Sequence, residues 1–355
     1  MDSGTHMAMN LFFAGLNALV FTFIAIPSII RVAQIKNLYD DPDTVRKTHI
    51  SSVPTLGGFA LFAGTIFSLT FWSNQNNFPE LQYIIASILI VFFIGIKDDI
   101  VQLVHWKKLA GQVLAAIILV HFAQIRLTTM CGIFGIYELP TAASYLFSIF
   151  TIIVITNSFN LIDGIDCLAG SIGALTSFVF GMWFHFYGKS EYAILAFSLL
   201  GSLIAFLWFN KTPAKIFMGD TGSLIIGLAN SIFAIKFIEL NWALSDTSSY
   251  KIFSIPVVTI CILIVPLFDT FRVFVIRLSR KQSPLKADRN HIHHILVDSG
   301  ISHIAATSIL FSINLLFIIF ALMFQHISSE LLFFITLSLA VILSVILVRY
   351  NKATC

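Results

Sequence analysis

Residues 82–99 read QYIIASILIVFFIGIKDD, an apolar segment that ends abruptly in one lysine and two aspartates. Similar apolar segments recur along the 355 residues, of which only 11% are charged. A soluble domain has about 25% charged residues, and a helix needs roughly 20 apolar residues to span a bilayer. Because lipid offers the backbone no hydrogen bonds, we expect an all-α integral membrane protein with about 11 transmembrane helices. The eleven segments are 11–30, 56–73, 82–96, 109–124, 142–156, 168–186, 192–209, 223–237, 253–275, 305–325 and 330–348.

Lysine and arginine set the expected orientation, because these residues are concentrated in cytoplasmic loops. If the first loop is cytoplasmic and the segments alternate, 17 of the 21 lysines and arginines face the cytoplasm and 4 face outside. The N-terminus is then outside and the C-terminus cytoplasmic. The same alternation brings the acidic and histidine-rich motifs to the cytoplasmic side, where we expect the active site.

Neither the N-terminal residues nor the cysteines form a recognisable functional motif. Residues 1–9 contain SGTHM, which is typical of an expression-tag remnant, and we interpret 10–355 as a single polytopic membrane domain. The four cysteines are scattered without CxxC spacing. We therefore expect neither a disulfide framework nor a zinc site.

Lys97-Asp98-Asp99 closes the third apolar segment. Two adjacent carboxylates at a membrane edge repel each other and are costly to desolvate, and a cation relieves both problems. Magnesium prefers carboxylate oxygens together with substrate phosphate. The alternative is a solvated helix end with a stop-transfer lysine.

Asn157, Asn160, Asp163 and Asp166 recur at every third position after the fifth segment. On an α-helix this spacing drifts by about 60° per step, so the four side chains do not share one narrow face. A helix that ends near Gly164 and turns still converges them on one pocket. Helix capping is the alternative, and it explains one of the four.

The stretch Phe217-Met-Gly-Asp220-Thr-Gly-Ser223 leads into the eighth segment. Such a glycine-rich turn exposes backbone N–H groups and the positive end of a helix dipole to an anion, with Asp220 placed to hold a metal beside it. The alternative is a threonine or serine N-cap.

The loop from Arg277 to His294 combines three histidines, His291, His293 and His294, with several arginines and lysines. This composition predicts a phosphate-binding surface. The alternatives are a zinc site and a patch for anionic lipid headgroups.

Two further motifs are less specific. Arg46, Lys47 and His49 lie in the charged first loop, and Asp269 stands one helical turn before Arg272, so these two side chains can form an ion pair.

In this order, the motifs resemble the polyprenyl-phosphate N-acetylhexosamine-1-phosphate transferases, the glycosyltransferase 4 or MraY–WecA–TagO superfamily. The resemblance covers essentially the whole chain after residue 9. The histidine loop, the Arg46-Lys47-x-His49 loop and the eleven segments are similar to the WecA/TagO branch. Cys167 stands where the family pattern DGxDGLA has glycine, a change that affects either sugar preference or only local packing.

The resemblance implies a bacterial cytoplasmic-membrane enzyme that transfers N-acetylglucosamine 1-phosphate from UDP-GlcNAc to undecaprenyl phosphate. UMP is released and cell-surface polysaccharide synthesis begins. It implies Mg²⁺, with Mn²⁺ as a substitute, and it is compatible with a homodimer. No nucleic-acid partner is expected.

The expected roles follow residue by residue. Asp98, Asp99 and Asp220 are the catalytic candidates, and Asp220, Asp99 and Asp163 the metal ligands. The predicted nucleotide- and sugar-binding residues are Asn160, Asp163, Asp166, Arg277, His291, His293 and His294. The predicted lipid-phosphate-binding residues are Arg46, Lys47 and His49.

Two alternatives stay open from the sequence. The same reaction can use UDP-GalNAc, UDP-FucNAc or UDP-QuiNAc, or the UDP-MurNAc-pentapeptide of the MraY type. A polytopic secondary transporter is the alternative of a different class, but it should show inverted repeats and broken helices, and no internal repeat is visible.

Overall fold

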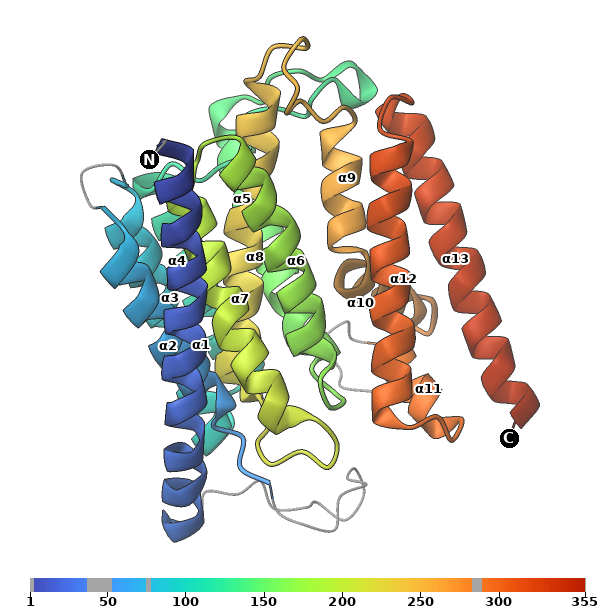
Figure 1. Ribbon diagram of the computed structural model, residues 1–355. Helices are drawn as coiled ribbons and strands as arrows, with labels where there is room; N and C mark the ends of the chain where they lie inside the picture. The colour runs from blue at the N-terminus through green and yellow to red at the C-terminus, as the bar shows by residue number, and fades with distance from the viewer. Residues whose placement is uncertain (1–2, 37–52, 75–77, 283–288, 355) are drawn as a thin grey trace.

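The computed structural model describes residues 3–36, 53–74, 78–282 and 289–354. Within these ranges the chain is a bundle of helices, and the single β-bridge joins Thr129 to Glu138. The two termini lie at opposite ends of the bundle (Figure 1). The helices are α1 (Ser3–Lys36), α2 (Gly57–Trp72), α3 (Leu81–Val101), α4 (His105–Ile117), η2 (Ile118–Phe122), η3 (Ile133–Gly135), α5 (Thr141–Ile162), α6 (Leu168–Phe186), α7 (Ser190–Asn210), α8 (Gly219–Trp242), α9 (Ile255–Ile262), α10 (Ile264–Ser279), α11 (Ile292–Asp298), α12 (His303–Met323) and α13 (Ser329–Thr354).

The expectation of an all-helical chain is confirmed within the described residues, and the helices are consistent with a multi-pass membrane protein. Seven helices in the described residues are long and apolar enough to cross a bilayer, or eight if one bent pair counts as a single span. Each of the eleven apolar segments coincides with one helix or two successive helices. The first helix also includes residues 3–9, which belong to the segment that we interpret as an expression-tag remnant.

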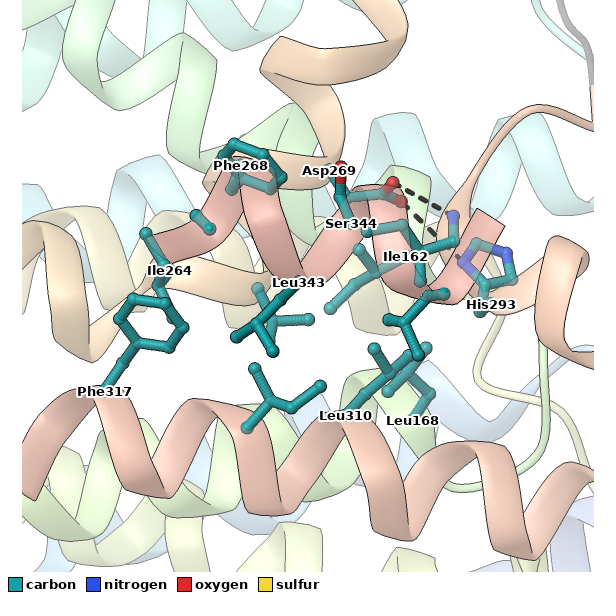
Figure 2. Close-up of a pocket in the computed structure, with 15 residues that line it drawn as sticks. Ile162, Leu168, Ile264, Phe268, Asp269, His293, Leu310, Phe317, Leu343 and Ser344 are labelled. Carbon is teal, nitrogen blue, oxygen red and sulfur yellow. Dashed lines mark hydrogen bonds and ion pairs between the residues drawn. The ribbon is translucent and has the colours of Figure 1, made fainter. Parts of the chain in front are cut away.

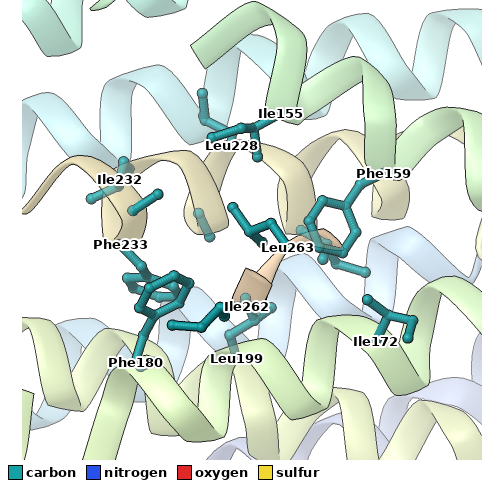
Figure 3. Packing of buried hydrophobic residues seen from close by; sticks show 14 of the residues in the cluster. Ile155, Phe159, Ile172, Phe180, Leu199, Leu228, Ile232, Phe233, Ile262 and Leu263 are labelled. Atoms are coloured by element: carbon teal, nitrogen blue, oxygen red, sulfur yellow. The ribbon is translucent and has the colours of Figure 1, made fainter. Parts of the chain in front are cut away.

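α8 forms the centre of the bundle and packs against α2, α3, α5 and α6. In its most apolar stretch 78% of the residues are buried, against 22% in α1 and in α13. Figure 3 shows part of this core, where Leu228 of α8 lies near Ile155 of α5 and Phe233 of α8 lies beside Phe180 of α6. The outer helices instead expose long apolar side chains, as expected of surfaces that face lipid.

The ninth apolar segment departs from the expectation of one continuous helix. It is broken at Leu263, where α9 and α10 meet at an angle of 85°. Asn314 of α12 spans the break: its side-chain oxygen accepts from the Val265 N–H at 3.2 Å, and its amide donates to the Ile262 carbonyl at 3.0 Å. Backbone groups freed inside a membrane protein need such partners, so one buried amide sustains a break that apolar patterning does not reveal.

We expect Asn314→Leu to lower the free energy of unfolding by about 1–3 kcal/mol, because two buried backbone groups lose their partner. Thermal unfolding of the detergent-solubilised protein measures the loss. Asn230→Leu in α8 is the matched control, since the only hydrogen bond of the Asn230 side chain within the described residues goes to the Ile226 carbonyl of its own helix. Equal losses for both variants would contradict this role of Asn314.

Candidate active site

Aspartates from two distant motifs meet where α3 ends and α8 begins. Asp99 accepts hydrogen bonds from the backbone N–H groups of Asp220 at 2.7 Å and Thr221 at 3.1 Å. It also accepts from the Thr221 hydroxyl at 2.6 Å. Asp99 therefore caps the N-terminus of α8 from a neighbouring helix, because the first N–H groups of any helix lack partners within it.

Glycines allow this close approach. A Cβ atom at Gly95 would lie 2.3 Å from the Cα of Thr221, so α3 contacts the α8 backbone directly. Gly219 has φ +70°, and a Cβ there would lie 2.7 Å from both carboxylate oxygens of Asp99. Only glycine fits these two positions, and together they fix Asp220 against the end of α3.

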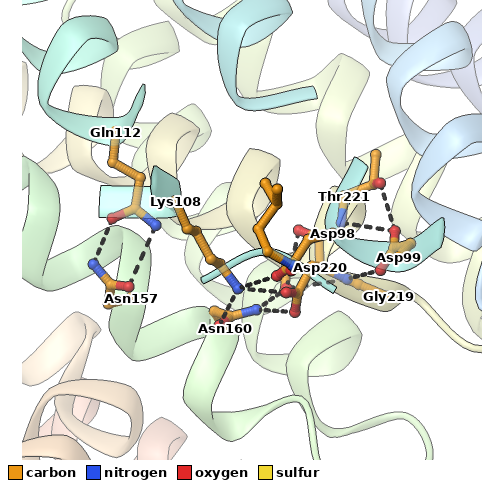
Figure 4. Close-up of polar contacts among 11 residues, drawn as sticks. Asp98, Asp99, Lys108, Gln112, Asn157, Asn160, Gly219, Asp220 and Thr221 are labelled. Carbon is orange, nitrogen blue, oxygen red and sulfur yellow. Dashed lines mark hydrogen bonds and ion pairs between the residues drawn. The ribbon is translucent and has the colours of Figure 1, made fainter. Parts of the chain in front are cut away.

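Lys108 of α4 lies at the centre of the cluster (Figure 4). Its Nζ lies 3.1 Å from Asp98 Oδ2, 3.1 Å from Asn160 Oδ1, and in contact with Asp220 Oδ2. Asn160 also donates to Asp220 Oδ1 at 2.6 Å and to the Ser223 hydroxyl at 2.9 Å. One cation is thus surrounded by oxygen atoms from three helices.

Asp163 ends α5 and belongs to the same acidic group. Burial, together with the negative charges of Asp220, Asp99 and Asp166, raises the pKa of Asp163 to about 8. A carboxylate with this environment binds a proton at neutral pH unless a cation neutralises its neighbours. Lys108 forms ion pairs with Asp98 and Asp220, and Asp99 also contacts the start of α8. Among the described residues of this cluster, three carboxylates therefore accompany one lysine even when Asp163 is protonated.

Asp166, three residues after Asp163, is 2% exposed. Its Oδ2 accepts from the Thr212 hydroxyl at 2.7 Å and lies 3.4 Å from His303 Nδ1. Its backbone carbonyl accepts from the Thr307 hydroxyl at 2.8 Å. The structure thus places Asp166 as a link from the turn after α5 to the α7–α8 connection and α12.

The histidine motif is anchored by Asp269 of α10. The Asp269 carboxylate lies 2.9 Å from His291 Nδ1 and accepts from the Ile292 N–H at 3.0 Å. Arg272 completes the anchor, 3.5 Å from Asp269 and donating to the Asn290 carbonyl at 2.7 Å. Asp269 therefore fixes where α11 begins.

His293 is buried, and Figure 2 shows it with Asp269 at one end of a mostly apolar pocket. Burial, together with the neighbouring His294, lowers the pKa of His293 to about 3. His293 is therefore neutral at physiological pH. A Cβ atom at Gly164 would lie 2.2 Å from His293 Nε2, so this ring contacts the turn that carries Asp163.

The rest of the motif differs in exposure. His294 is half-buried, and burial together with Arg289 lowers its pKa. Arg277 is buried within α10. Arg46, Lys47 and His49 lie outside the described residues.

A divalent cation fits the donor atoms of the acidic cluster. The oxygens of Asp98, Asp220 and Asn160 that surround Lys108 Nζ are hard ligands of the kind Mg²⁺ and Mn²⁺ take. Among the described residues, however, no three His, Cys, Asp or Glu side chains are grouped as a metal cluster. Asp99 already uses both oxygens as the cap of α8, so it is a weaker ligand candidate than Asp220.

Comparison with known proteins assigns the family. The profile of glycosyl transferase family 4 matches residues 81–238. A probable undecaprenyl-phosphate N-acetylglucosaminyl 1-phosphate transferase of Bacillus subtilis is 31% identical over 330 residues, which are 93% of this chain and 89% of the relative. The chain belongs to glycosyl transferase family 4. An undecaprenyl-phosphate alpha-N-acetylglucosaminyl 1-phosphate transferase of Escherichia coli K12 is 29% identical, covering 76% of this chain and 72% of the relative.

The family 4 segment, 81–238, begins with α3 and contains all of the acidic cluster. The grouping of Asp98, Asp99, Asn160 and Asp220 expected from the motifs is present in the structure. The histidine motif lies beyond this segment and meets the cluster through the contact between His293 and Gly164.

Lys108 was missed as a site residue, because the sequence counted it only among the cytoplasmic positive charges. One signal for it exists. Lys108 and Gln112 stand four residues apart, and both project inward from α4, whose Trp106 and Leu109 are exposed. Polar residues at helical spacing on an inward face indicate a site or a buried network.

The backbone conformation at Cys167 accounts for the glycine that the DGxDGLA pattern has at this position. Cys167 has φ +67°, a left-handed conformation that glycine adopts without strain, and its N–H donates to Asn210 Oδ1 at 2.7 Å. We therefore expect Cys167→Gly to keep the free energy of unfolding within about 1 kcal/mol of the parent, since relief of strain offsets the added chain entropy.

Cys167→Val should instead lower stability by about 1–2 kcal/mol, because a β-branched residue tolerates this conformation poorly. Thermal midpoints of the three proteins in one detergent measure the order. A valine variant at least as stable as the glycine variant would contradict the role of the backbone angle.

Proposed function

We propose that this chain transfers N-acetylglucosamine 1-phosphate from UDP-GlcNAc to undecaprenyl phosphate and releases UMP. The printed names of the bacterial relatives support this substrate pair. The observation that carries the proposal is the contact of Lys108 Nζ with oxygens of Asp98, Asn160 and Asp220. It supports a proposed cation-binding centre at one end of the bundle, where a lipid-borne phosphate and a soluble nucleotide can meet.

A divalent cation is part of the proposal, because the reactants are both anions and the cluster already carries excess negative charge. Asp220, Asp98, Asn160 and Asp163 would hold the ion, and Mg²⁺ or Mn²⁺ would neutralise charge on the donor's diphosphate. Lys108 would then move from the centre toward a substrate phosphate, for which its flexible stem and compact charge are suited.

Other side chains supply positioning. Asp98 would orient or deprotonate the acceptor phosphate for attack on the β-phosphorus of the donor, and UMP would leave. His293 is neutral, so it would contact the donor as a hydrogen-bonding group rather than as a cation. Holding both reactants in attack geometry is a large part of the rate enhancement in reactions of this kind.

The acceptor's apolar chain needs a path beside the cluster. Two apolar pockets border α10, and one of them includes His293, which contacts the turn that carries Asp163. The pocket in Figure 2 is lined by Ile264, Phe268, Leu310, Phe317 and Leu343, with His293 at its end. The other lies between α5, α8, α9 and α10 and is lined by residues that include Phe150, Val154, Ile235, Ile260 and Leu267.

The finer calls on the membrane are also proposals. Eleven crossings with the N-terminus outside and the active site in the cytoplasm are supported by the asymmetry of lysine and arginine and by the opposite ends of the termini. The bacterial relatives favour the cytoplasmic membrane. A homodimer stays a prediction from the family resemblance.

A secondary transporter remains the rival of a different class, because the break between α9 and α10 is a feature such proteins share. The acidic cluster lies where helices end, and not at the break. Flux into liposomes without release of UMP would favour the transporter.

The test is transfer of radiolabelled sugar phosphate into undecaprenyl phosphate with a panel of UDP-amino sugars. We expect UDP-GlcNAc to be the preferred donor, with one UMP released for each lipid product. Preference for UDP-GalNAc or UDP-MurNAc-pentapeptide would keep the reaction and change the sugar. No transfer from any donor would overturn the proposal.

Metal removal provides the second test. We expect EDTA to abolish transfer and added Mg²⁺ or Mn²⁺ to restore it. Asp220→Asn should lower turnover by at least about 100-fold, because it removes one anionic ligand from the centre of charge stabilisation. Turnover in EDTA equal to that in Mg²⁺ would contradict the metal assignment. The thermal midpoint of Asp220→Asn, which we expect to match the parent, is the folding control.

A further inference from the structure

A reciprocal pair of amides lies one helical turn from the cation-binding centre. Asn157 donates to Gln112 Oε1 at 2.6 Å, and Gln112 donates back to Asn157 Oδ1 at 3.3 Å (Figure 4). Asn157 also donates to the Ile153 carbonyl of its own helix at 2.8 Å. The pair joins α4 to α5 and touches none of the acidic residues.

The spacing links this pair to the site. Gln112 is four residues after Lys108 on α4, and Asn157 is three residues before Asn160 on α5, so each amide shares a helix face with a site residue. Lys108 and Asn160 are themselves in contact at 3.1 Å. Two contacts therefore join α4 to α5: the Gln112–Asn157 pair and the Lys108–Asn160 pair. Only the Lys108–Asn160 pair also contacts Asp220.

Besides Lys108 and the amide pair, α4 is held by the Ser87 hydroxyl of α3, which donates to the Ala115 carbonyl at 3.1 Å, and by close packing of Gly111 against Ile94. The buried residues of α4 are Gln112, Ala115 and Ala116, and the alanines have short side chains that interlock poorly. Between residues 105 and 112 Trp106 and Leu109 are exposed, and Gln112, at 2% exposed, is the only buried residue. The amide pair is thus the side-chain contact that ties this face of α4 to α5 beside Lys108.

We propose that Gln112 and Asn157 are positioning residues that set the rotation of α4 and so hold Lys108 and Asn160 in register with Asp220. This inference rests on the proposed transferase function. Buried amides suit the task because each is costly to leave without a partner, so rotations of α4 that separate them are disfavoured. A displacement of about 1 Å at a catalytic centre can lower turnover by about 100-fold.

The experiment compares Gln112→Leu and Asn157→Leu with the exchanged pair Gln112→Asn/Asn157→Gln. The exchange keeps the same total side-chain length across the gap and restores both hydrogen bonds. Asn230→Leu is the matched control, since it replaces a buried amide of α8 that bonds only within its own helix among the described residues. Each protein is measured for kcat, for KM of UDP-GlcNAc, for the Mg²⁺ concentration at half-maximal rate, and for its thermal midpoint.

We expect each leucine variant to lose on the order of 100-fold in kcat and to need more Mg²⁺, with KM changed less than kcat. The exchanged pair should recover to within about tenfold of the parent, which a merely additive effect of two substitutions would not give. Asn230→Leu should keep the parent values.

Two results would overturn the inference while leaving the transferase assignment intact: an active parent with an equally active Gln112→Leu variant, or an exchanged pair no better than the single variants. If the thermal midpoint falls together with activity and the exchanged pair does not recover, the inference is likewise overturned. A parent inactive with every donor would overturn the proposed function itself, and the inference with it.

Discussion

The ammonium group of Lys108 lies among oxygens of Asp98, Asn160 and Asp220, and the rest of the site is arranged around this contact. Several carboxylates so close together repel one another, and in a weakly screened environment the cost is high unless a cation lies between them. Asp99 caps α8, and glycines bring α3 against that helix. Asn160 of α5 donates a hydrogen bond to Asp220. The bundle thus builds a place for positive charge at the point where its helices end.

A second constraint is the separation of charge from apolar surface. The acidic cluster lies at helix ends, whereas the pockets beside α10 are almost wholly apolar. The break at Leu263, sustained by Asn314, turns α10 away from α9 and leaves these pockets on both of its sides. A lipid phosphate joins the same two properties in one molecule, which is why this arrangement suits such an acceptor better than a water-soluble one.

Much of this was predictable from the sequence, and the rest required the fold. Long apolar runs predicted the helices, and polar residues at their ends predicted that Asp98, Asp99, Asn160 and Asp220 converge. Lys108 was overlooked because a lysine near a helix start reads as a topology signal until its neighbours are known. The break within 253–275 was equally hidden, since its partner Asn314 lies on another helix. The capping role of Asp99 depends on contacts with α8, far away in the sequence.

The most direct test of this account is anomalous diffraction from crystals grown with Mn²⁺ and UMP. The account predicts one strong anomalous peak within coordination distance of Asp220, with Asp98 or Asp163 beside it and Lys108 displaced from the centre. A peak bound elsewhere, or the Lys108 contacts unchanged with no metal near Asp220 at saturating Mn²⁺, would contradict the central claim.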